Sequence, residues 1–396
     1  MQADEALASL KKGASQIISE AELRAKLALG RPLRVKLGVD PTTADIHLGH
    51  TVVLRKLRQF QDLGHQAVLI IGDFTGMIGD PSGRAVTRPH LTHREVMANA
   101  ETYRDQAFKI LDHRRTETVC NGDWFRAMSY EDVIRLNSRV TLQQMLQRED
   151  FRSRIDNQHA IHAHEIQYPI MQGWDSVMVK ADIELGGTDQ LFNILVGRDF
   201  QKEENQPQQV VMTMPLLEGL DGVKKMSKSL GNFVGVSEPA VDMFGKIMSI
   251  SDQLMARYYD VLLGGELPQN ANPLASKKHL AFEIVKTYHS AEIAEKTVAD
   301  WNARFSEKRL DEADLPKVDA TVFVPHGVEA TGFVGDVVTA FREAFGVQKS
   351  RAEASRLIKQ GSVQVDGQKI VDPKSKVELK PGQVLRLDKT HAVRIK

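Results

Sequence analysis

Cysteine and long hydrophobic runs are scarce in this sequence. Its 396 residues include a single cysteine, Cys120, which excludes an internal disulfide and a cysteine-rich metal site. No stretch approaches the roughly 20 apolar residues that a membrane-spanning helix needs. The chain opens on Met1-Gln2-Ala3-Asp4-Glu5, without a basic region followed by an apolar run. We therefore expect a cytoplasmic protein with no membrane partner.

Net charge and a familiar phosphate-binding motif are also missing. The sequence has 52 basic and 52 acidic residues, so its bulk charge does not indicate a nucleic-acid partner. The distribution is uneven, because Lys349–Lys396 holds 12 lysines and arginines against 5 acidic residues. This basic module predicts a polyanionic partner, although a solvated charged face is the simpler alternative. A Walker-type Gly-x-x-x-x-Gly-Lys-Ser/Thr stretch is absent, so other residues must bind any phosphates.

The order of the expected elements predicts a parallel α/β sheet. Residues 33–39 alternate in hydrophobicity, a helix follows His50, and residues 67–71 form a fully apolar run. Strand, helix and strand in this order indicate a doubly wound sheet, which binds ligands at the carboxyl ends of its strands. Further strands are expected at 116–120, 177–179 and 209–214.

The remaining segments differ in character from this sheet. Residues 1–30 and 239–305 show mainly helical periodicity. Residues 308–325 contain two prolines and many charges, which is typical of a linker. Near the C-terminus, Asp366-Gly367 between alternating apolar residues predicts a β-hairpin. The length of the chain favours two or three domains.

Two histidines, His47 and His50, stand three residues apart where a helix is expected to begin. A helix N-terminus offers unpaired N–H groups and a favourable dipole to phosphate, and imidazoles add donors. Gly49 between them lets a ribose or purine approach the backbone. A metal site is less favoured because no companion ligands are evident. A structural role is the common alternative for such a pair.

A short basic stretch, Lys225-Met226-Ser227-Lys228-Ser229, offers the second candidate for phosphate chemistry. Its lysines could neutralise the charge that develops on a leaving pyrophosphate, an effect that matters most in the transition state. A solvated basic turn is the alternative for any group of neighbouring lysines.

The two stretches together resemble the signature sequences of class I aminoacyl-tRNA synthetases. Lys225–Ser229 matches letter for letter, and His47-Leu48-Gly49-His50 differs only by leucine for the usual isoleucine. Over nearly the whole chain the sequence resembles the bacterial tyrosyl-tRNA synthetase family, most clearly at 38–42, 78–83, 168–172 and 186–190.

The resemblance implies an α/β fold with three domains. These are a Rossmann-like parallel-sheet catalytic domain over 1–222, the lysine loop with a helical anticodon-recognition domain over 223–325, and a small α+β S-four-like RNA-binding domain over 333–396. In the last domain, three basic residues recur at helical spacing and are expected to face RNA phosphates; they are Arg351, Arg356 and Lys359.

The activity that the resemblance implies is ligation of tyrosine to tRNA(Tyr). Tyrosine is first activated by ATP with Mg²⁺, then transferred to the 3′ end of the tRNA, without a tightly bound cofactor or a metal site in the protein. The family is homodimeric. Positioning and charge stabilisation would come from Thr42, His47, His50, Lys225 and Lys228. The resemblance extends ATP binding to Asp40, Gly49, Arg84, Arg88, Asp189, Met226, Ser227 and Ser229.

Recognition of tyrosine is assigned by the same resemblance. Three residues are expected around the α-ammonium group: Asp80, Tyr168 and Gln172. Asp175 is expected at the phenolic hydroxyl and Gln190 in the pocket wall; without the surrounding motifs, Asp175 would read as a helix-surface acid and Tyr168 as a core aromatic.

One position departs from some family members. Lys36 stands where they have a tyrosine whose hydroxyl contacts the substrate phenol. Lysine can donate to a phenolic oxygen but cannot accept from it. We expect Lys36 to contact the substrate in this way.

Three alternatives to this function stay open. A tryptophan enzyme is the nearest relative, a nucleotidyl transferase could adenylate a small carboxylate without tRNA, and a synthetase-like RNA-binding protein could lack catalysis. The intact histidine and lysine stretches favour catalysis, and the basic C-terminal module favours tRNA. A local histidine cluster is interpreted as packing and surface rather than as a metal site; it comprises His159, His162 and His164.

Overall fold

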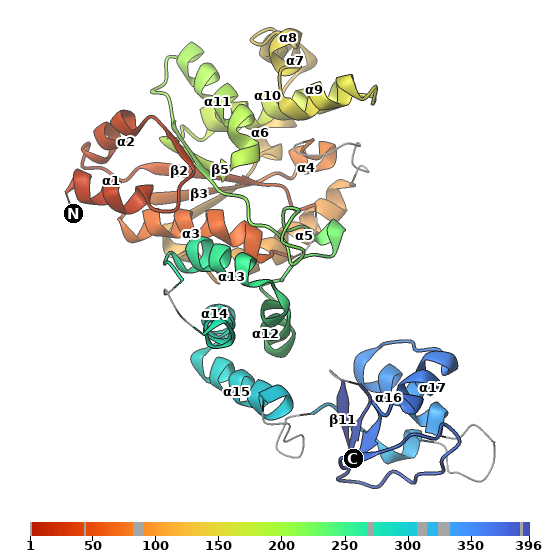
Figure 1. The fold of residues 1–396 in the computed structure, drawn as a ribbon. Helices are drawn as coiled ribbons and strands as arrows, with labels where there is room; N and C mark the ends of the chain where they lie inside the picture. Colours follow the sequence, from red (N-terminus) through yellow and green to blue (C-terminus); the bar gives the residue numbers. More distant parts are fainter. Residues whose placement is uncertain are drawn as a thin grey trace. The chain divides into compact units, whose positions relative to one another are not determined.

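The computed structural model describes residues 2–42, 45–81, 91–267, 272–306, 315–323, 333–388 and 391–396. The chain forms two compact units, Met1–Ala291 and Glu292–Lys396 (Figure 1). The helices that follow the lysine stretch, through α14, belong to the first unit. The three functional domains stay a prediction.

A six-stranded sheet forms the centre of the first unit, in the order β1-β6-β5-β2-β3-β4. The strands β2 to β6 are parallel, and the short β1 adds an antiparallel edge to β6. The expected strands around 33–39, 67–71, 116–120 and 209–214 are confirmed, whereas β1 lies in a segment expected to be helical. The bounds are β1 Gln16–Ile18, β2 Arg34–Val39, β3 Gln66–Ile71, β4 Thr116–Cys120, β5 Ile183–Gly187 and β6 Val210–Met214.

The strand expected at 177–179 is wrong. Helix α10 runs from Ala163 to Met178 and ends where Lys180 takes a left-handed backbone with φ of 50°. A short valine-rich run cannot be told from the end of a buried helix by periodicity alone. The strand at this point of the chain is β5, which begins at Ile183.

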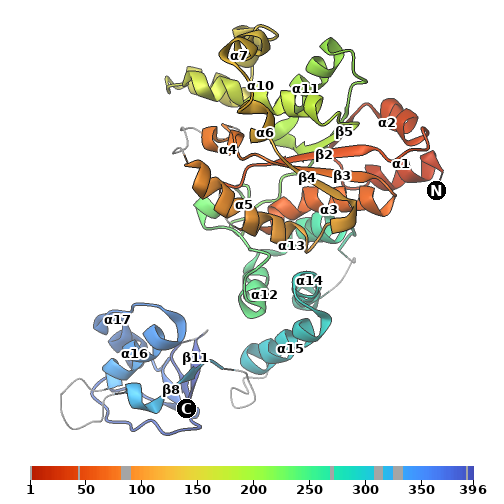
Figure 2. The same ribbon diagram turned by 180° about the vertical axis from the view of Figure 1, so that it is seen from behind.

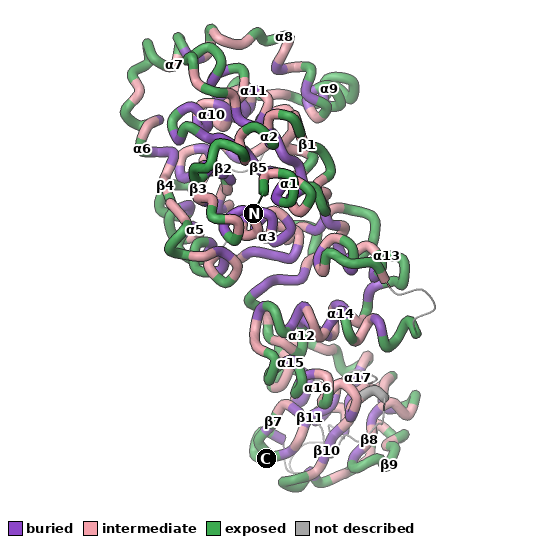
Figure 3. Tube along the Cα trace, turned by 90° about the vertical axis from the view of Figure 1, so that its left-hand side faces the viewer, coloured by how far each residue is buried: buried purple, intermediate pink, exposed green. Residues whose placement is uncertain are grey.

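Helices cover both faces of the sheet. Figures 1 and 2 show α10 and α11 on one face and α3 and α5 on the other. The inward sides of α3 and α10 are buried (Figure 3). No helix in the described part of the chain is both long enough and apolar enough to cross a bilayer. The helices of this unit are α1 Ala3–Lys11, α2 Glu20–Leu27, α3 Leu48–Asp62, α4 Thr75–Ile78, α5 His93–Ala107, α6 Gly122–Phe125, α7 Tyr130–Asn137, α8 Leu142–Met145, α9 Glu149–Asp156, α10 Ala163–Met178, α11 Leu191–Glu203, α12 Ala240–Ser249, α13 Asp252–Tyr258 and α14 Pro273–Tyr288.

The strand order places a switch point between β2 and β5. From β2 the chain proceeds outward through β3 to β4, while β5 leads outward in the opposite direction to β6. The loops that follow β2 and β5 therefore lead in opposite directions along the sheet, and a crevice forms beyond the carboxyl ends of these two strands. Those ends lead directly into Asp40 and Thr188.

The described part of the second unit combines helices with a five-stranded sheet in the order β7-β11-β10-β8-β9. The expected hairpin is confirmed, because Asp366 and Gly367 both have positive φ between β8 and β9. The expected linker contributes a strand, since β7 pairs with β11; part of that linker lies outside the described residues. The bounds are α15 Ala291–Trp301, β7 Lys317–Val318, α16 Phe333–Phe345, α17 Arg351–Lys359, β8 Gln364–Val365, β9 Gln368–Lys369, β10 Val384–Arg386 and β11 Ala392–Ile395.

Candidate active site

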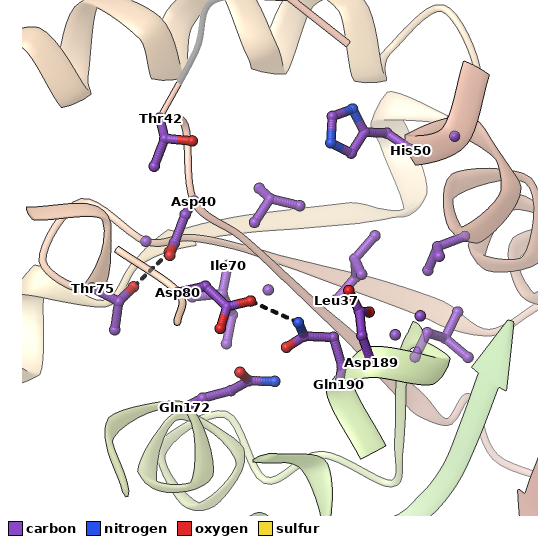
Figure 4. A pocket seen from close by; sticks show the side chains of 18 of the residues that line it. Leu37, Asp40, Thr42, His50, Ile70, Thr75, Asp80, Gln172, Asp189 and Gln190 are labelled. Atoms are coloured by element: carbon purple, nitrogen blue, oxygen red, sulfur yellow. Dashed lines mark hydrogen bonds between the residues drawn. The ribbon is translucent and has the colours of Figure 1, made fainter. Parts of the chain in front are cut away.

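A cavity of about 300 Å³ lies at the carboxyl ends of the central strands. Figure 4 shows Thr42 and His50 on one side of it and Gln172 on the opposite side. Lys36, Lys228 and Ser229 are not among the residues that line it. Arg84 and Arg88 lie outside the described residues. The predicted site residues that do line the cavity are Asp40, Thr42, His47, Gly49, His50, Asp80, Tyr168, Gln172, Asp175, Asp189, Gln190, Lys225, Met226 and Ser227.

Backbone hydrogen bonds join the histidine stretch to the chain that follows the lysine stretch. The amide of Leu48 donates to the carbonyl of Val234 at 2.9 Å, and the amide of Val236 donates to Ile46 at 2.9 Å. His47 and Gly235 form the bridge between them. Two segments far apart in the sequence are thus fixed side by side at one end of the cavity.

The two histidine rings are stacked, with centroids 3.8 Å apart. The amide of His47 donates to Nδ1 of His50 at 3.3 Å, which places the ring proton of a neutral His50 on Nε2. Burial, with the neighbouring His50, lowers the pKa of His47 to about 2. Burial and the charge of Lys225 lower the pKa of His50 to about 4. Both rings are therefore neutral donors at neutral pH.

Two glycines allow a close approach of chain segments at this end. A Cβ on Gly49 would lie 3.0 Å from the His47 ring and 3.5 Å from Cβ of Met226. A Cβ on Gly72 would lie 2.0 Å from Oδ1 of Asp40, so no larger residue fits after β3. Gly72 follows the apolar run at 67–71 directly, and a glycine in that position is expected where the backbone must approach another group closely.

The lysines of the basic stretch are held by carboxylates. Lys225 Nζ lies 2.9 Å from Oδ2 of Asp189, and Lys228 pairs with Asp45. The loop itself is shaped by Asn232, whose Oδ1 accepts from the amide of Ser227 at 2.8 Å. Lys225 therefore brings a cation to the cavity wall near the two histidines.

Asp40 connects the end of β2 to two other elements. Its Oδ1 accepts from Thr75 at 2.7 Å (Figure 4), and its Oδ2 accepts from the hydroxyl of Tyr168 at 2.7 Å. Asn121 donates to Thr75 at 2.9 Å and extends this network deeper into the site. Tyr168 is thus placed in the cavity wall, as expected, with its hydroxyl on a carboxylate.

Asp80 is oriented by two donors. Gln190 Nε2 donates to its Oδ2 at 2.7 Å (Figure 4), and Arg148 Nη2 donates to its Oδ1 at 3.2 Å. Arg148 is only 4% exposed, and it stands between α8 and α9. The sequence analysis did not find it, because the helices beside it carry no motif. A carboxylate held in place by an amide and a guanidinium suits an ammonium group as a further donor.

Asp175 lies at the deep end of the cavity and is 3% exposed. Trp124 Nε1 donates to its Oδ1 at 2.9 Å, and Asn121 Nδ2 donates to its Oδ2 at 3.3 Å. Burial raises the pKa of the Asp175 carboxyl to about 7, although Lys36 opposes this rise. Trp124 and Asn121 were missed; the position of Asn121 directly after β4 was its only signal.

Lys36 does not contact the cavity as we expected. Its ammonium is fully buried and lies 2.9 Å from the carbonyl of Gln172, 2.7 Å from Ser176 Oγ and 2.8 Å from Glu184 Oε1. An ammonium has three donors, and these three acceptors occupy them. Lys36 therefore reaches the site only through its neighbours.

The remaining predicted residues lie elsewhere. Arg351, Arg356 and Lys359 are exposed on α17, which turns Ala354 and Ile358 into the core of the second unit. In the histidine cluster, the rings of His162 and His164 stack 5.8 Å apart. Within the described ranges no group of three or more metal-ligating side chains is found.

Two family models match the chain. One, tRNA synthetases class I (W and Y), covers residues 28–314, and the S4 domain covers residues 345–385. The chain therefore belongs to the class I tRNA synthetases of the tryptophan and tyrosine family. Its curated relatives carry the more particular name tyrosine–tRNA ligase: that of Idiomarina loihiensis is 49% identical, over 99% of this chain and 98% of the relative. The ligase of Oleidesulfovibrio alaskensis is 47% identical, over 100% and 99%.

Solved structures share the fold. Tyrosyl-tRNA synthetase from Aeropyrum pernix aligns with a TM-score of 0.60 at 20% identity, over 76% of this chain and 98% of that one. The enzyme from Archaeoglobus fulgidus, complexed with L-tyrosine, aligns with a TM-score of 0.59 at 21% identity, over 75% and 99%. The predicted parallel-sheet α/β class is confirmed.

Proposed function

We propose that this chain is a tyrosine–tRNA ligase, which activates tyrosine with ATP and transfers it to the 3′ end of tRNA(Tyr) in the cytoplasm. One observation carries the proposal: a single cavity has two neutral histidines and Lys225 at one end and a buried carboxylate, Asp175, at the other. The first end suits phosphates, and the second suits a hydrogen-bond donor on an otherwise apolar side chain.

In the first step, a carboxylate oxygen of tyrosine attacks the α-phosphorus of Mg·ATP. A bond forms between this carboxylate oxygen and the α-phosphorus. The bond from the α-phosphorus to the oxygen that bridges it to the β-phosphorus breaks, and pyrophosphate leaves. No protein nucleophile is required, so the protein contributes orientation and charge stabilisation. His47 and His50 donate to phosphoryl oxygens, while Lys225 and Lys228 neutralise the leaving group. Thr42 adds a hydroxyl donor, and Arg84 and Arg88 are proposed to meet pyrophosphate.

The remaining ATP contacts follow from the cavity wall. Asp189 accepts from the ribose hydroxyls, and Gly49 leaves room for the nucleoside against the backbone. Asp40 stands between the α-phosphate and the amino acid. Met226, Ser227 and Ser229 form the loop backbone that carries the two lysines. In the second step a terminal tRNA hydroxyl attacks the tyrosyl carbonyl, and AMP leaves.

Tyrosine is oriented by charge at one end and by a hydrogen bond at the other. Its ammonium binds Asp80, with Tyr168 and Gln172 beside it. Gln190 holds the carboxylate of Asp80 in place. Its phenolic hydroxyl donates to Asp175. Phenylalanine offers this buried carboxylate no hydrogen-bond donor of its own, and the lost hydrogen bond disfavours it in the site.

The tRNA would contact a helical anticodon-binding region and the basic face of α17, where Arg351, Arg356 and Lys359 are exposed. We place the functional domains at 1–222, 223–325 and 333–396. Loss of charging without loss of tyrosine activation in variants of these three basic residues would support the assignment. Equal loss of both activities would count against it.

A homodimer is proposed from apolar side chains that stand exposed on α7, α8 and α9. Tyr130 is 80% exposed, Ile134 53%, Leu142 57% and Ile155 49%. Large apolar side chains that stay exposed on several helices are expected at a protein interface. Sedimentation velocity should show a dimer that Ile134→Asp converts to monomers; a monomeric parent protein would refute it.

Amino-acid-dependent exchange of pyrophosphate into ATP tests the proposed activity. Each of the twenty amino acids is offered in turn, and we expect exchange with tyrosine. Exchange with tryptophan instead would identify the neighbouring specificity of the family. Absence of exchange with every amino acid would indicate an inactive RNA-binding relative.

A further inference from the structure

The buried ion pair beneath the pocket joins two neighbouring parallel strands. Lys36 of β2 and Glu184 of β5 are register partners, and their side chains are 0% and 1% exposed. Neighbouring positions on one face of a sheet bring such side chains together. The pair therefore lies on the face of the sheet that packs against α10.

Every polar atom of this pair has a partner. Ser176 accepts from Lys36 and donates to Glu184 Oε2 at 2.8 Å. Gln172 and Gln209 also donate to Glu184. Four donors thus surround the carboxyl oxygens of Glu184, and one of them is the facing ammonium of Lys36. Removing one partner would leave an uncompensated charge in the core.

The pair lies directly beneath Asp175. Asp175 stands on α10 between Gln172 and Ser176, the two residues that Lys36 contacts. The charged groups acting on it are Lys36 from β2 and Glu184 from β5, and Lys36 has the larger effect. From the segment after β4, Asn121 and Trp124 contribute neutral donors.

We propose that Lys36 is a positioning residue of the tyrosine pocket, whose buried charge favours the ionised form of Asp175, the form that accepts the phenolic hydrogen. Lys36 thereby sets the preference for tyrosine over phenylalanine without touching either. The inference rests on the proposed function and assigns the specificity of that site to a charge outside it.

The donors around Asp175 agree with this role. Each of its oxygens already accepts one N–H, from Trp124 and from Asn121, and neither partner can accept a proton. An ionised carboxylate fits these two donors and has lone pairs left for the phenol. Burial alone would favour the protonated form. The charge of Lys36 opposes this burial more than either hydrogen bond does.

The test removes both charges of the pair while keeping its shape. Lys36→Met/Glu184→Gln avoids the unpaired Glu184 that Lys36→Met alone would leave in the core. We measure the ratio of kcat/KM for tyrosine to that for phenylalanine, in pyrophosphate exchange, between pH 6 and pH 9. Because Lys36 outweighs Glu184, loss of both should raise the pKa of Asp175. At pH 6 we expect the ratio to fall about tenfold below that of the parent, and at pH 9 the two should agree.

The matched control is Lys56→Met. Lys56 is another buried lysine of the first unit with three acceptors, the carbonyls of Leu10 and Lys12 and Oε1 of Gln59. Its replacement should leave the pH dependence of the ratio unchanged. A structural defect would lower activity at every pH, and recovery at pH 9 would not follow from it.

The outcomes separate the two proposals. A parent protein without tyrosine-dependent exchange refutes the proposed function. A parent that exchanges with tyrosine, together with a double variant whose ratio follows the parent at every pH, refutes the inference about Lys36 alone. A ratio that is lowered equally at pH 6 and pH 9 also refutes it.

Discussion

Replacing Asp45 by asparagine should tighten the binding of ATP. The carboxylate of Asp45 pairs with Lys228, one of the two lysines proposed to bind pyrophosphate. ATP phosphates must compete with that carboxylate for the same ammonium. Asparagine keeps the size of the side chain and removes its charge, so the competition weakens and Lys228 becomes available to the phosphates.

The expected size of the effect follows from the exposure of the pair. The side chains of Lys228 and Asp45 are 32% and 42% exposed, so solvent screens their attraction. Pairs of this kind contribute at most about 1 kcal/mol. If all of it opposes ATP binding, the KM for ATP should fall by up to about fivefold. The effect should shrink in high salt, because ions screen exposed charges.

The assay is pyrophosphate exchange at saturating tyrosine, with ATP varied, at low and at high salt. Asp62→Asn is the matched control, since it removes one acid from an exposed ion pair with Arg58 at the far end of α3. The control should leave the KM for ATP unchanged. An Asp45→Asn variant whose KM rises, or stays within the range of the control, would show that Asp45 supports the lysine loop instead of competing for it.

Four further expectations follow from the site. Arg148→Lys should raise the KM for tyrosine roughly tenfold in exchange kinetics and spare that for ATP, because one donor to Asp80 is lost; an equal rise in both would contradict this. The pKa of Asp175 is raised from 3.8 to about 7, so its stability cost is absent below pH 4 and complete above pH 7; Asp175→Asn should therefore melt higher than the parent at pH 8.5 but not at pH 4. The ring carbon signals of His50 should not titrate between pH 6 and pH 8, because its pKa is about 4; an NMR midpoint near 6.5 would be incompatible with a buried neutral ring. Deletion of 333–396 should spare exchange and weaken tRNA charging, and parallel losses would argue against a separate RNA-binding module.

Local patterns predicted much of the sheet and the phosphate end of the site. The strands that became β2, β3 and β6 are marked by alternation or by apolar runs, and the carboxyl-end rule then placed His47 and His50 at a ligand site. These signals are local because a strand or a helix start depends on adjacent residues. The three-residue β1 has too little pattern to be recognised and forms through its pairing with β6.

The amino-acid end was harder to predict because its contacts join distant segments. Trp124 and Asn121 reach Asp175 from the chain after β4, and Arg148 reaches Asp80 from between two short helices. No spacing in the sequence encodes such pairs. Lys36 shows the same limit: its strand was predicted, but its partner Glu184 is set by the pairing of β2 with β5.

The two ends of the cavity use charge in opposite ways, and the chemistry accounts for the difference. At the phosphate end the histidines are neutral, and the cations Lys225 and Lys228 lie on partly exposed side chains paired to Asp189 and Asp45. A permanent buried cation there would bind the phosphates of ATP and of the transition state alike, and uniform binding does not lower the barrier. Each lysine must leave its carboxylate to reach pyrophosphate. The exchange is therefore most favourable when negative charge develops on the leaving pyrophosphate. At the end proposed for the phenol ring no bond forms or breaks, so a fixed charge beneath Asp175 costs no rate and can serve the proposed selectivity.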